Sequence, residues 1–146
     1  MNPIANGNAG LHDGANRQSV PPRIIALGFY DGPTNGAIRF ADGTEFRFDL
    51  TDESDLGSEG RTFSFAPLPA GSFDRLAATI SAHIPPQWPT WVPIWRFPTT
   101  EIQRGVEAET DAILAEAGPP LWVVDAVDYY TFTEFRATQL PNAQPA

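Results

Sequence analysis

A stretch rich in proline and tryptophan, residues 85–98, constrains the fold of this chain more than any other segment. Its sequence is PPQWPTWVPIWRFP, and it holds five of the chain's fifteen prolines and three of its four tryptophans. Proline lacks a backbone N–H and biases the preceding residue toward extended geometry, so prolines at this density exclude a helix. We therefore expect an extended segment, named the Trp/Pro ribbon below.

The aromatic rings of the ribbon need shelter from water, because each buries on the order of 150–250 Å² of mostly apolar surface. One interpretation is a proline-stiffened lid packed on the core, since large aromatic residues are mostly buried. The other is an aromatic ledge that binds a peptide or ligand, with an arginine available for cation–π or carboxylate contacts. The residues predicted to bind a ligand or partner are Trp88, Trp91, Trp95, Arg96 and Phe97.

The composition points to a single soluble domain. A chain of 146 residues is long enough to bury its own core. The absence of cysteine excludes disulfides and thiol chemistry and fits a reducing cytoplasm. No window holds the roughly 18 apolar residues of a membrane helix, and residues 1–20 lack the basic start and apolar run of a signal peptide. We expect a cytoplasmic protein that contacts no membrane.

The net charge of the chain indicates which classes of partner it can bind. Nine arginines, no lysine and eighteen acidic residues give a net charge of −9. Such a field repels phosphates, and the basic stripe that nucleic-acid binding requires is missing. We therefore expect no nucleic acid and favour a basic protein partner, with simple solubility as the alternative role of the charge. The absence of lysine suggests the codon bias of a GC-rich bacterial genome.

The hydrophobic patterns predict an α+β fold, an antiparallel β-meander of about five strands with two amphipathic helices packed on one face. Residues 1–20 and 141–146 are expected to be disordered tails, and residues 21–140 a single domain. The strands are predicted near 23–31, 36–41, 44–50, 61–66 and 121–127, and the helices near 72–84 and 100–117. Residues 128–140 fit either a strand or a short helix, and we favour the strand.

Two local patterns sharpen this prediction. In the first strand, strict alternation places Phe29 on the same face as Leu27, with Ala26 on the other face. In the hairpin that follows, a two-residue turn would set apolar against charged residues across the strands, so that register is rejected. A three-residue loop with Gly43 in the left-handed conformation removes the conflict. It pairs Phe40 with Thr44, Arg39 with Glu45 and Ile38 with Phe46.

The helices have recognisable starting signals. Ser72 is the predicted N-cap of the first helix, and Thr100 with Gln103 has the spacing of a capping box at the start of the second. The buried stripe of the first helix is predicted to contain Phe73, Leu76, Ala77, Ile80 and Ile84, and that of the second Ile102, Val106, Ile113, Leu114 and Ala117.

Motifs of the common enzyme classes are absent from the sequence. There is no nucleotide-binding glycine loop, no nucleophile elbow and no zinc-protease motif. With two histidines and no cysteine, the usual zinc sites are excluded. The acidic stretch 49–60 has serine and glycine where a calcium loop needs glycine and glutamate. We therefore predict no catalytic residue, no metal and no cofactor.

Three functional hypotheses follow from these observations. The favoured one is a non-catalytic acidic protein-interaction module that uses the Trp/Pro ribbon as its binding surface. The second is a small hydrolase in which Asp125 or Asp128 pairs with Glu134 beside an aromatic platform. The third is an acidic nucleic-acid mimic or inhibitor of a basic protein, which requires carboxylates in a regular array.

Overall fold

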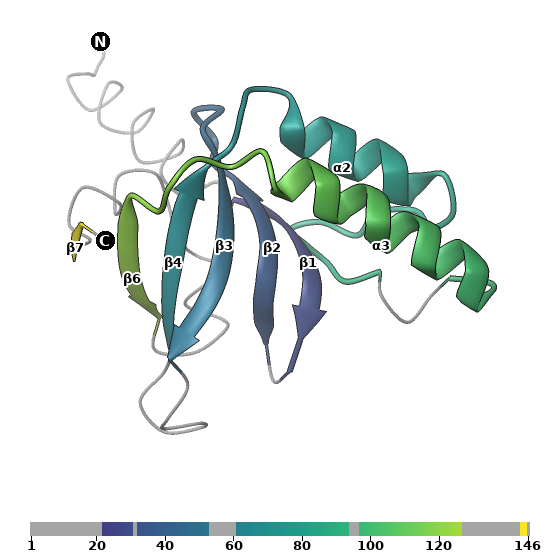
Figure 1. Cartoon of the computed structure of the whole chain (residues 1–146), viewed down its shortest axis with the longest axis horizontal. Coiled ribbons are helices and arrows are strands. Elements are labelled where there is room, and N and C mark those ends of the chain that lie inside the picture. Colours follow the sequence, from purple (N-terminus) through teal and green to yellow (C-terminus); the bar gives the residue numbers. More distant parts are fainter. Residues whose placement is uncertain (1–21, 31, 53–60, 94–96, 127–143, 146) are drawn as a thin grey trace, which may run out of the picture.

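The protein folds into a β-sheet with two helices beside it (Figure 1). The computed structural model describes residues 22–30, 32–52, 61–93, 97–126 and 144–145, and all structural statements below concern these residues. The strands are β1 (Arg23–Phe29), β2 (Pro33–Arg39), β3 (Glu45–Asp52), β4 (Arg61–Pro67), β5 (Thr90–Trp91), β6 (Trp122–Ala126) and β7 (Gln144–Pro145). The helices are α2 (Ser72–Ser81) and α3 (Thr100–Leu114), and neither is long and apolar enough to cross a membrane.

The sheet has the strand order β5-β1-β2-β3-β4-β6-β7. Consecutive strands from β1 to β4 pair antiparallel, and β6 adds antiparallel to β4. The α+β class and the antiparallel meander are therefore confirmed. The short strand β5 differs, because it pairs parallel with β1 and makes the sheet mixed. Strand β7 lies within the segment expected to be a C-terminal tail and pairs with β6.

The predicted register of the β2–β3 hairpin is confirmed. Arg39 pairs with Glu45 and Ile38 pairs with Phe46. The Phe40 N–H donates to the Thr44 carbonyl at 2.9 Å, which closes the three-residue loop. Gly43 has a φ of 91°, the left-handed conformation that the loop requires.

Strand β1 departs from the predicted alternation at its end. The pairing with β2 shifts register on both sides of Gly28, which is the mark of a β-bulge. An extra residue in one strand turns the following side chains to the opposite face. Phe29 accordingly packs with the cluster that contains Ala26, whereas Leu27 packs on the other side of the sheet. The prediction that Phe29 shares a face with Leu27 is wrong for this reason.

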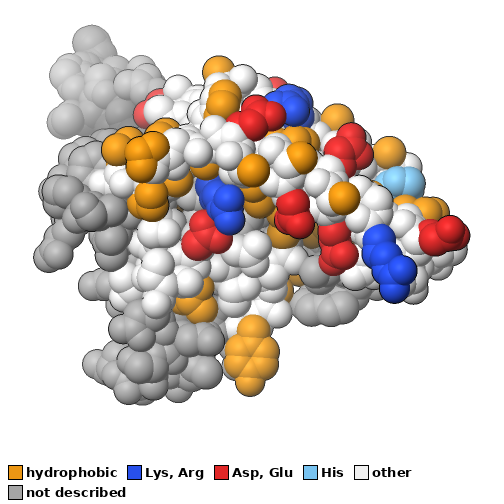
Figure 2. All heavy atoms as spheres, in the orientation of Figure 1, with side chains coloured by type: hydrophobic (Ala, Val, Ile, Leu, Met, Phe, Trp, Pro, Cys, Tyr) orange, Lys and Arg blue, Asp and Glu red, His pale blue; other side chains and the backbone are white. Residues whose placement is uncertain are grey.

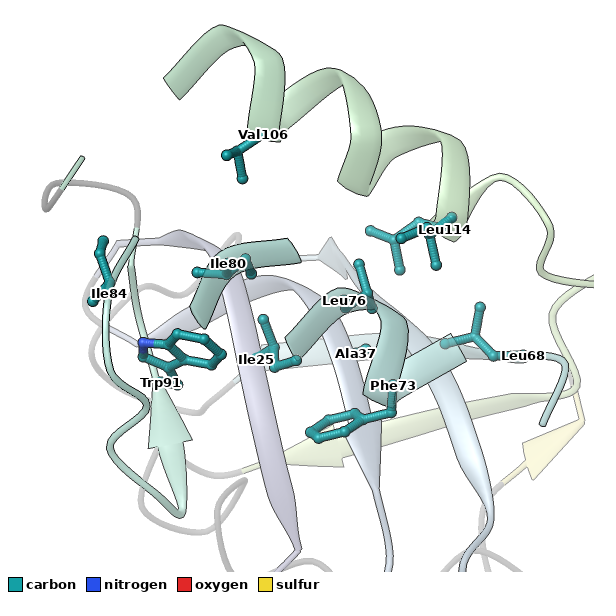
Figure 3. Packing of buried hydrophobic residues seen from close by; sticks show 11 residues of the cluster. Ile25, Ala37, Leu68, Phe73, Leu76, Ile80, Ile84, Trp91, Val106 and Leu114 are labelled. Atoms are coloured by element: carbon teal, nitrogen blue, oxygen red, sulfur yellow. The ribbon is translucent and has the colours of Figure 1, made fainter. Parts of the chain in front are cut away.

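The two faces of the sheet carry separate hydrophobic clusters. On one face, the described buried cluster consists of residues of β1 to β4 and of Phe40, which directly follows β2: Ile24, Ala26, Ile38, Phe40, Phe46, Phe48, Phe63 and Phe65. On the other face, Ile25 of β1 and Ala37 of β2 share a cluster with both helices and with the Trp/Pro ribbon. Figure 3 shows side chains of α2 and α3, together with Trp91, directed into this second cluster.

In both helices the N-cap residue lies one position before the predicted one. The N-cap of α2 is Gly71 rather than Ser72, and a carboxylate from the sheet replaces the side-chain cap. Glu45 of β3 accepts hydrogen bonds from the backbone N–H groups of Phe73 at 2.8 Å and Gly71 at 3.2 Å. For α3, Thr99 rather than Thr100 is the cap, and its hydroxyl accepts from the Ile102 N–H at 3.1 Å.

Candidate functional site

The Trp/Pro ribbon passes from the end of α2 along the edge of the sheet. Its central residues, Thr90 and Trp91, form β5, and the Pro89 carbonyl accepts from the Ile24 N–H at 2.7 Å. Trp91 is only 2% exposed and belongs to the core, whereas Trp88 is half-buried. This part of the ribbon therefore packs on the domain and keeps part of one indole ring at the surface.

Trp88 lies in a cluster of aromatic rings. Its ring centroid lies 5.5 Å from that of Phe73 and 5.8 Å from that of Trp91. The guanidinium carbon of Arg23 lies 5.2 Å from the centroid of the Trp88 ring, within cation–π range. Arg23 of β1 therefore supplies a cation–π contact within the protein, whereas the prediction for Arg96 concerned contacts with a ligand and stays a prediction. Arg96 and Trp95 lie outside the described residues.

A first hollow of about 220 Å³ lies between the ribbon and α3, and we call it the acid-rimmed hollow. Its apolar surface comes from β1, the ribbon and the inner side of α3, and its rim carries two exposed carboxylates. The residues that line it are Leu27, Asn35, Pro93, Phe97, Val106, Glu107, Thr110 and Asp111. Of the predicted site residues that the structure describes, Phe97 lies on its wall, and the Phe97 ring also meets that of His83 edge-on at 6.0 Å.

The two rim carboxylates have no arginine partner in the described part of the chain. Glu107 accepts a hydrogen bond of 3.3 Å from the side-chain amide of Gln103, one turn earlier in α3. The Thr110 hydroxyl between them is satisfied, because it donates to the Glu107 carbonyl at 3.0 Å. Among the described residues, the rim therefore presents two negative charges that no arginine neutralises, next to an apolar floor.

A second hollow of about 290 Å³ lies on the other side of the ribbon, at the free edge of β5, and we call it the edge cavity. It is lined by Phe29, Ile84, Pro85, Gln87, Thr90, Trp91 and Val92. Five of these seven side chains are apolar or aromatic, and none of the seven is charged. The ribbon thus contributes most of the wall of this cavity.

Two of the residues that line this cavity each have a buried hydrogen-bonding group without a partner in the described part of the chain. They are the Thr90 hydroxyl and the indole Nε1–H of Trp91. Figure 3 shows the Trp91 nitrogen turned toward Ile84, another residue of the cavity wall, and away from Ile25. Most buried polar groups in proteins are hydrogen-bonded, so these two adjacent residues are exceptions.

The acidic residues of the hydrolase hypothesis are only partly within the described structure. The backbone of Asp125 lies in β6, opposite Thr62 of β4. Its side chain, and residues Asp128 and Glu134 as a whole, lie outside the described residues, as does most of the acidic stretch 49–60. Among the residues that are described, no three His, Asp or Glu side chains gather as a metal site would require.

Sequence reasoning missed most of the residues that line the two hollows. Glu107 and Asp111 carry a weak signal, because they are four residues apart and flank the buried stripe of α3. Thr110 carries another, since it occupies a position of that stripe where an apolar residue would be expected. Thr90 and Gln87 carry none, because their place depends on how the ribbon meets the sheet edge.

Comparison with protein-family models, with curated proteins and with solved structures finds no significant match for this chain. Its geometry alone defines its class. It is an α+β domain in which the Trp/Pro ribbon separates two surface hollows, one with an acidic rim and one whose described lining residues are uncharged.

Proposed function

We propose that this protein is a non-catalytic interaction domain of the bacterial cytoplasm that binds a basic protein partner beside the Trp/Pro ribbon. The observation that supports this proposal is the acid-rimmed hollow, in which two carboxylates without an arginine partner among the described residues border an apolar floor. The lack of cysteine and lysine in the chain supports the cellular setting.

The hollow matches the side chain of an arginine or lysine presented by the partner. Such side chains have an apolar stem that packs on hydrophobic surface and a cationic end that seeks a carboxylate. The stem would lie on Leu27, Val106 and the half-buried ring of Phe97. The cation would then reach Glu107 and Asp111 at the rim. Arginine fits best, because its planar guanidinium also stacks on aromatic rings.

The wider surface of α3 favours the same partner. Between Thr100 and Leu114 the helix carries four carboxylates and one arginine. Figure 2 shows acidic and basic side chains together on this side of the molecule, with several acidic ones over the helices. Arg39 pairs with Asp74 and Arg75 with Glu116, so part of the basic charge on this side is already neutralised. A basic partner would be attracted by this field, and high salt would weaken the attraction.

The test is a titration with N-acetyl-arginine N-methylamide, followed by NMR of the protein backbone. Its uncharged isostere, N-acetyl-citrulline N-methylamide, serves as the control ligand. We expect saturable shifts at residues of the hollow, such as Leu27 and Val106, with the arginine compound only. The double variant E107Q/D111N should weaken this binding by about three- to tenfold, because it removes two charge-assisted contacts.

A matched double variant, E101Q/E109Q, controls for the overall charge. Glu101 and Glu109 are exposed on the same helix and do not line the hollow, so both double variants lose the same net charge. If the two variants weaken binding equally, the loss reflects the overall negative charge of the protein, and the hollow is not the binding site. Equal binding of the arginine and citrulline compounds would contradict the proposal altogether.

A further inference from the structure

We propose that the acid-rimmed hollow recognises an arginine residue inside the partner chain by two features, its guanidinium and a main-chain carbonyl next to it, and that Asn35 binds the carbonyl. This inference rests on the proposed function and deepens it, because it names the second group that the partner must present. It also assigns a role in specificity to a residue of β2 rather than of α3.

The side chain of Asn35 lies on the face of the sheet that carries the hollow. Side chains alternate along a strand, so Asn35 shares a face with Ala37, which packs in the cluster that contains both helices. No register shift occurs between these two residues where β2 pairs with β3, so the alternation holds here. Asn35 accordingly lines the hollow together with Glu107 and Asp111 of α3.

The amide oxygen of Asn35 is already engaged within the protein. It accepts a hydrogen bond of 3.3 Å from the Thr34 hydroxyl. It also occupies the space beside Gly28, because a Cβ added to Gly28 would lie only 2.1 Å from this oxygen. The missing side chain of Gly28 thus makes room for the Asn35 amide and sets its oxygen against β1. The amide nitrogen is directed away from Gly28.

The amide nitrogen of Asn35 is a hydrogen-bond donor without a partner in the described part of the chain. It is accessible to solvent, since it is not among the unpaired side-chain atoms that are buried. This group can only donate, so it cannot bond to a guanidinium, which also only donates. In a complex it requires an acceptor. A neutral carbonyl fits best, because Glu107 and Asp111 in the same hollow would repel a carboxylate.

The separation of these groups matches an arginine residue within a peptide chain. Figure 1 shows the end of β2 that joins β1, to which Asn35 belongs, standing apart from both helices, whereas Glu107 and Asp111 are part of α3. Apolar surface of Leu27 and Val106 lines the same hollow. In an arginine residue the main-chain carbonyl and the guanidinium likewise lie at opposite ends of an apolar stem.

The experiment compares two ligands on the wild-type protein by the NMR titration described above. N-acetyl-arginine N-methylamide carries the guanidinium and main-chain carbonyls, whereas N-butylguanidinium carries the guanidinium and an apolar stem alone. We expect the first ligand to bind about two- to tenfold more tightly, the value of one hydrogen bond. We also expect the side-chain N–H resonances of Asn35 to move with the first ligand and to stay in place with the second.

Two variants of Asn35 separate its hydrogen bond from the charge of the hollow. N35L removes the donor at nearly the same size, and N35D replaces it by an acceptor. Each variant should bind the two ligands about equally. N35D should bind N-butylguanidinium at least as tightly as the wild type does, because the added carboxylate attracts the cation. N35D decides the matter if N35L fails to fold.

A pair of glycine variants tests how Asn35 is positioned. G28A should remove the preference for the arginine compound, because the added Cβ would displace the Asn35 amide. G105A is the matched control, since its Cβ meets nothing within 4 Å, and it should keep the preference. A preference that survives in G28A would contradict this positioning.

The outcomes distinguish this inference from the proposed function. If the arginine and citrulline compounds bind the wild type equally, the proposed function fails and the inference fails with it. If the arginine compound binds through its charge but no more tightly than N-butylguanidinium, the inference alone is wrong. It is also wrong if N35L or N35D retains the preference of the wild type.

Discussion

Two threonines in different surroundings allow the unpaired Thr90 hydroxyl to be tested by stability alone. The Thr90 hydroxyl is buried and has no partner. Thr110 is 2% exposed, and its hydroxyl donates a hydrogen bond to the Glu107 carbonyl at 3.0 Å. Replacing each by valine keeps the branched shape and removes only the polar atom. The two substitutions should therefore change stability in opposite directions.

The expected magnitudes follow from the hydrogen bonds. An unpaired buried polar group costs about 1–3 kcal/mol. Because Thr90 borders a cavity rather than solid packing, we take the lower end and expect T90V to raise the free energy of unfolding by about 1 kcal/mol. T110V removes a satisfied hydrogen bond and should lower it by about 0.5–1.5 kcal/mol. For a chain of 146 residues, 1 kcal/mol corresponds to a shift of about 3–5 °C in Tm.

The measurement is urea unfolding of both variants and the wild type, followed by far-ultraviolet circular dichroism, with Tm as a second value. The two variants should differ by about 2 kcal/mol, which is larger than the error of such a comparison. A T90V protein that loses as much stability as T110V would show that the Thr90 hydroxyl has a partner in solution. The hydroxyl would then not be the unpaired group that this prediction requires.

Three further changes in stability can be measured by the same unfolding experiments. A Cβ at Gly36 would lie 1.9 Å from the Ile25 carbonyl oxygen, so G36A should lower the free energy of unfolding by at least about 3 kcal/mol. Gly105 lies inside α3 with nothing within 4 Å of the added atom, so G105A should raise that free energy by about 0.5–1 kcal/mol, and a loss would contradict this view of the helix. Glu45 caps α2 from the sheet, so E45A should cost about 1–2 kcal/mol and E45Q less, whereas equal losses would show that packing rather than hydrogen bonding matters there.

The parts of the fold that were predictable from sequence depend on residues close together in the chain. The hairpin register follows from the conflict between apolar and charged residues in the alternative, and Gly43 supplies the turn. The helical stripes follow from spacing, and Leu76 and Ile80 are buried as expected. Such patterns act within a few residues, so a single sequence displays them directly.

The parts that could not be predicted depend on contacts between distant segments. Trp91 pairs with Ile25 across the parallel β1–β5 contact, and no local pattern announces a strand of two residues. The cap of α2 is missed for the same reason, because Glu45 lies well before the helix in sequence. The bulge at Gly28 is also set by pairing with β2. Of the predicted site, the sequence identified the ribbon but not the hollows on its two sides.

The carboxylate of Glu45 couples formation of the β2–β3 hairpin to formation of α2. We expect the first turn of α2 to become stable once the neighbouring hairpin has brought this side chain into place. An isolated peptide of residues 69–84 should therefore be largely unstructured in water, since ten helical residues are too few to persist without help. Assembly of the domain is expected to start with the local hairpin, and the helix to form on the surface that the hairpin provides.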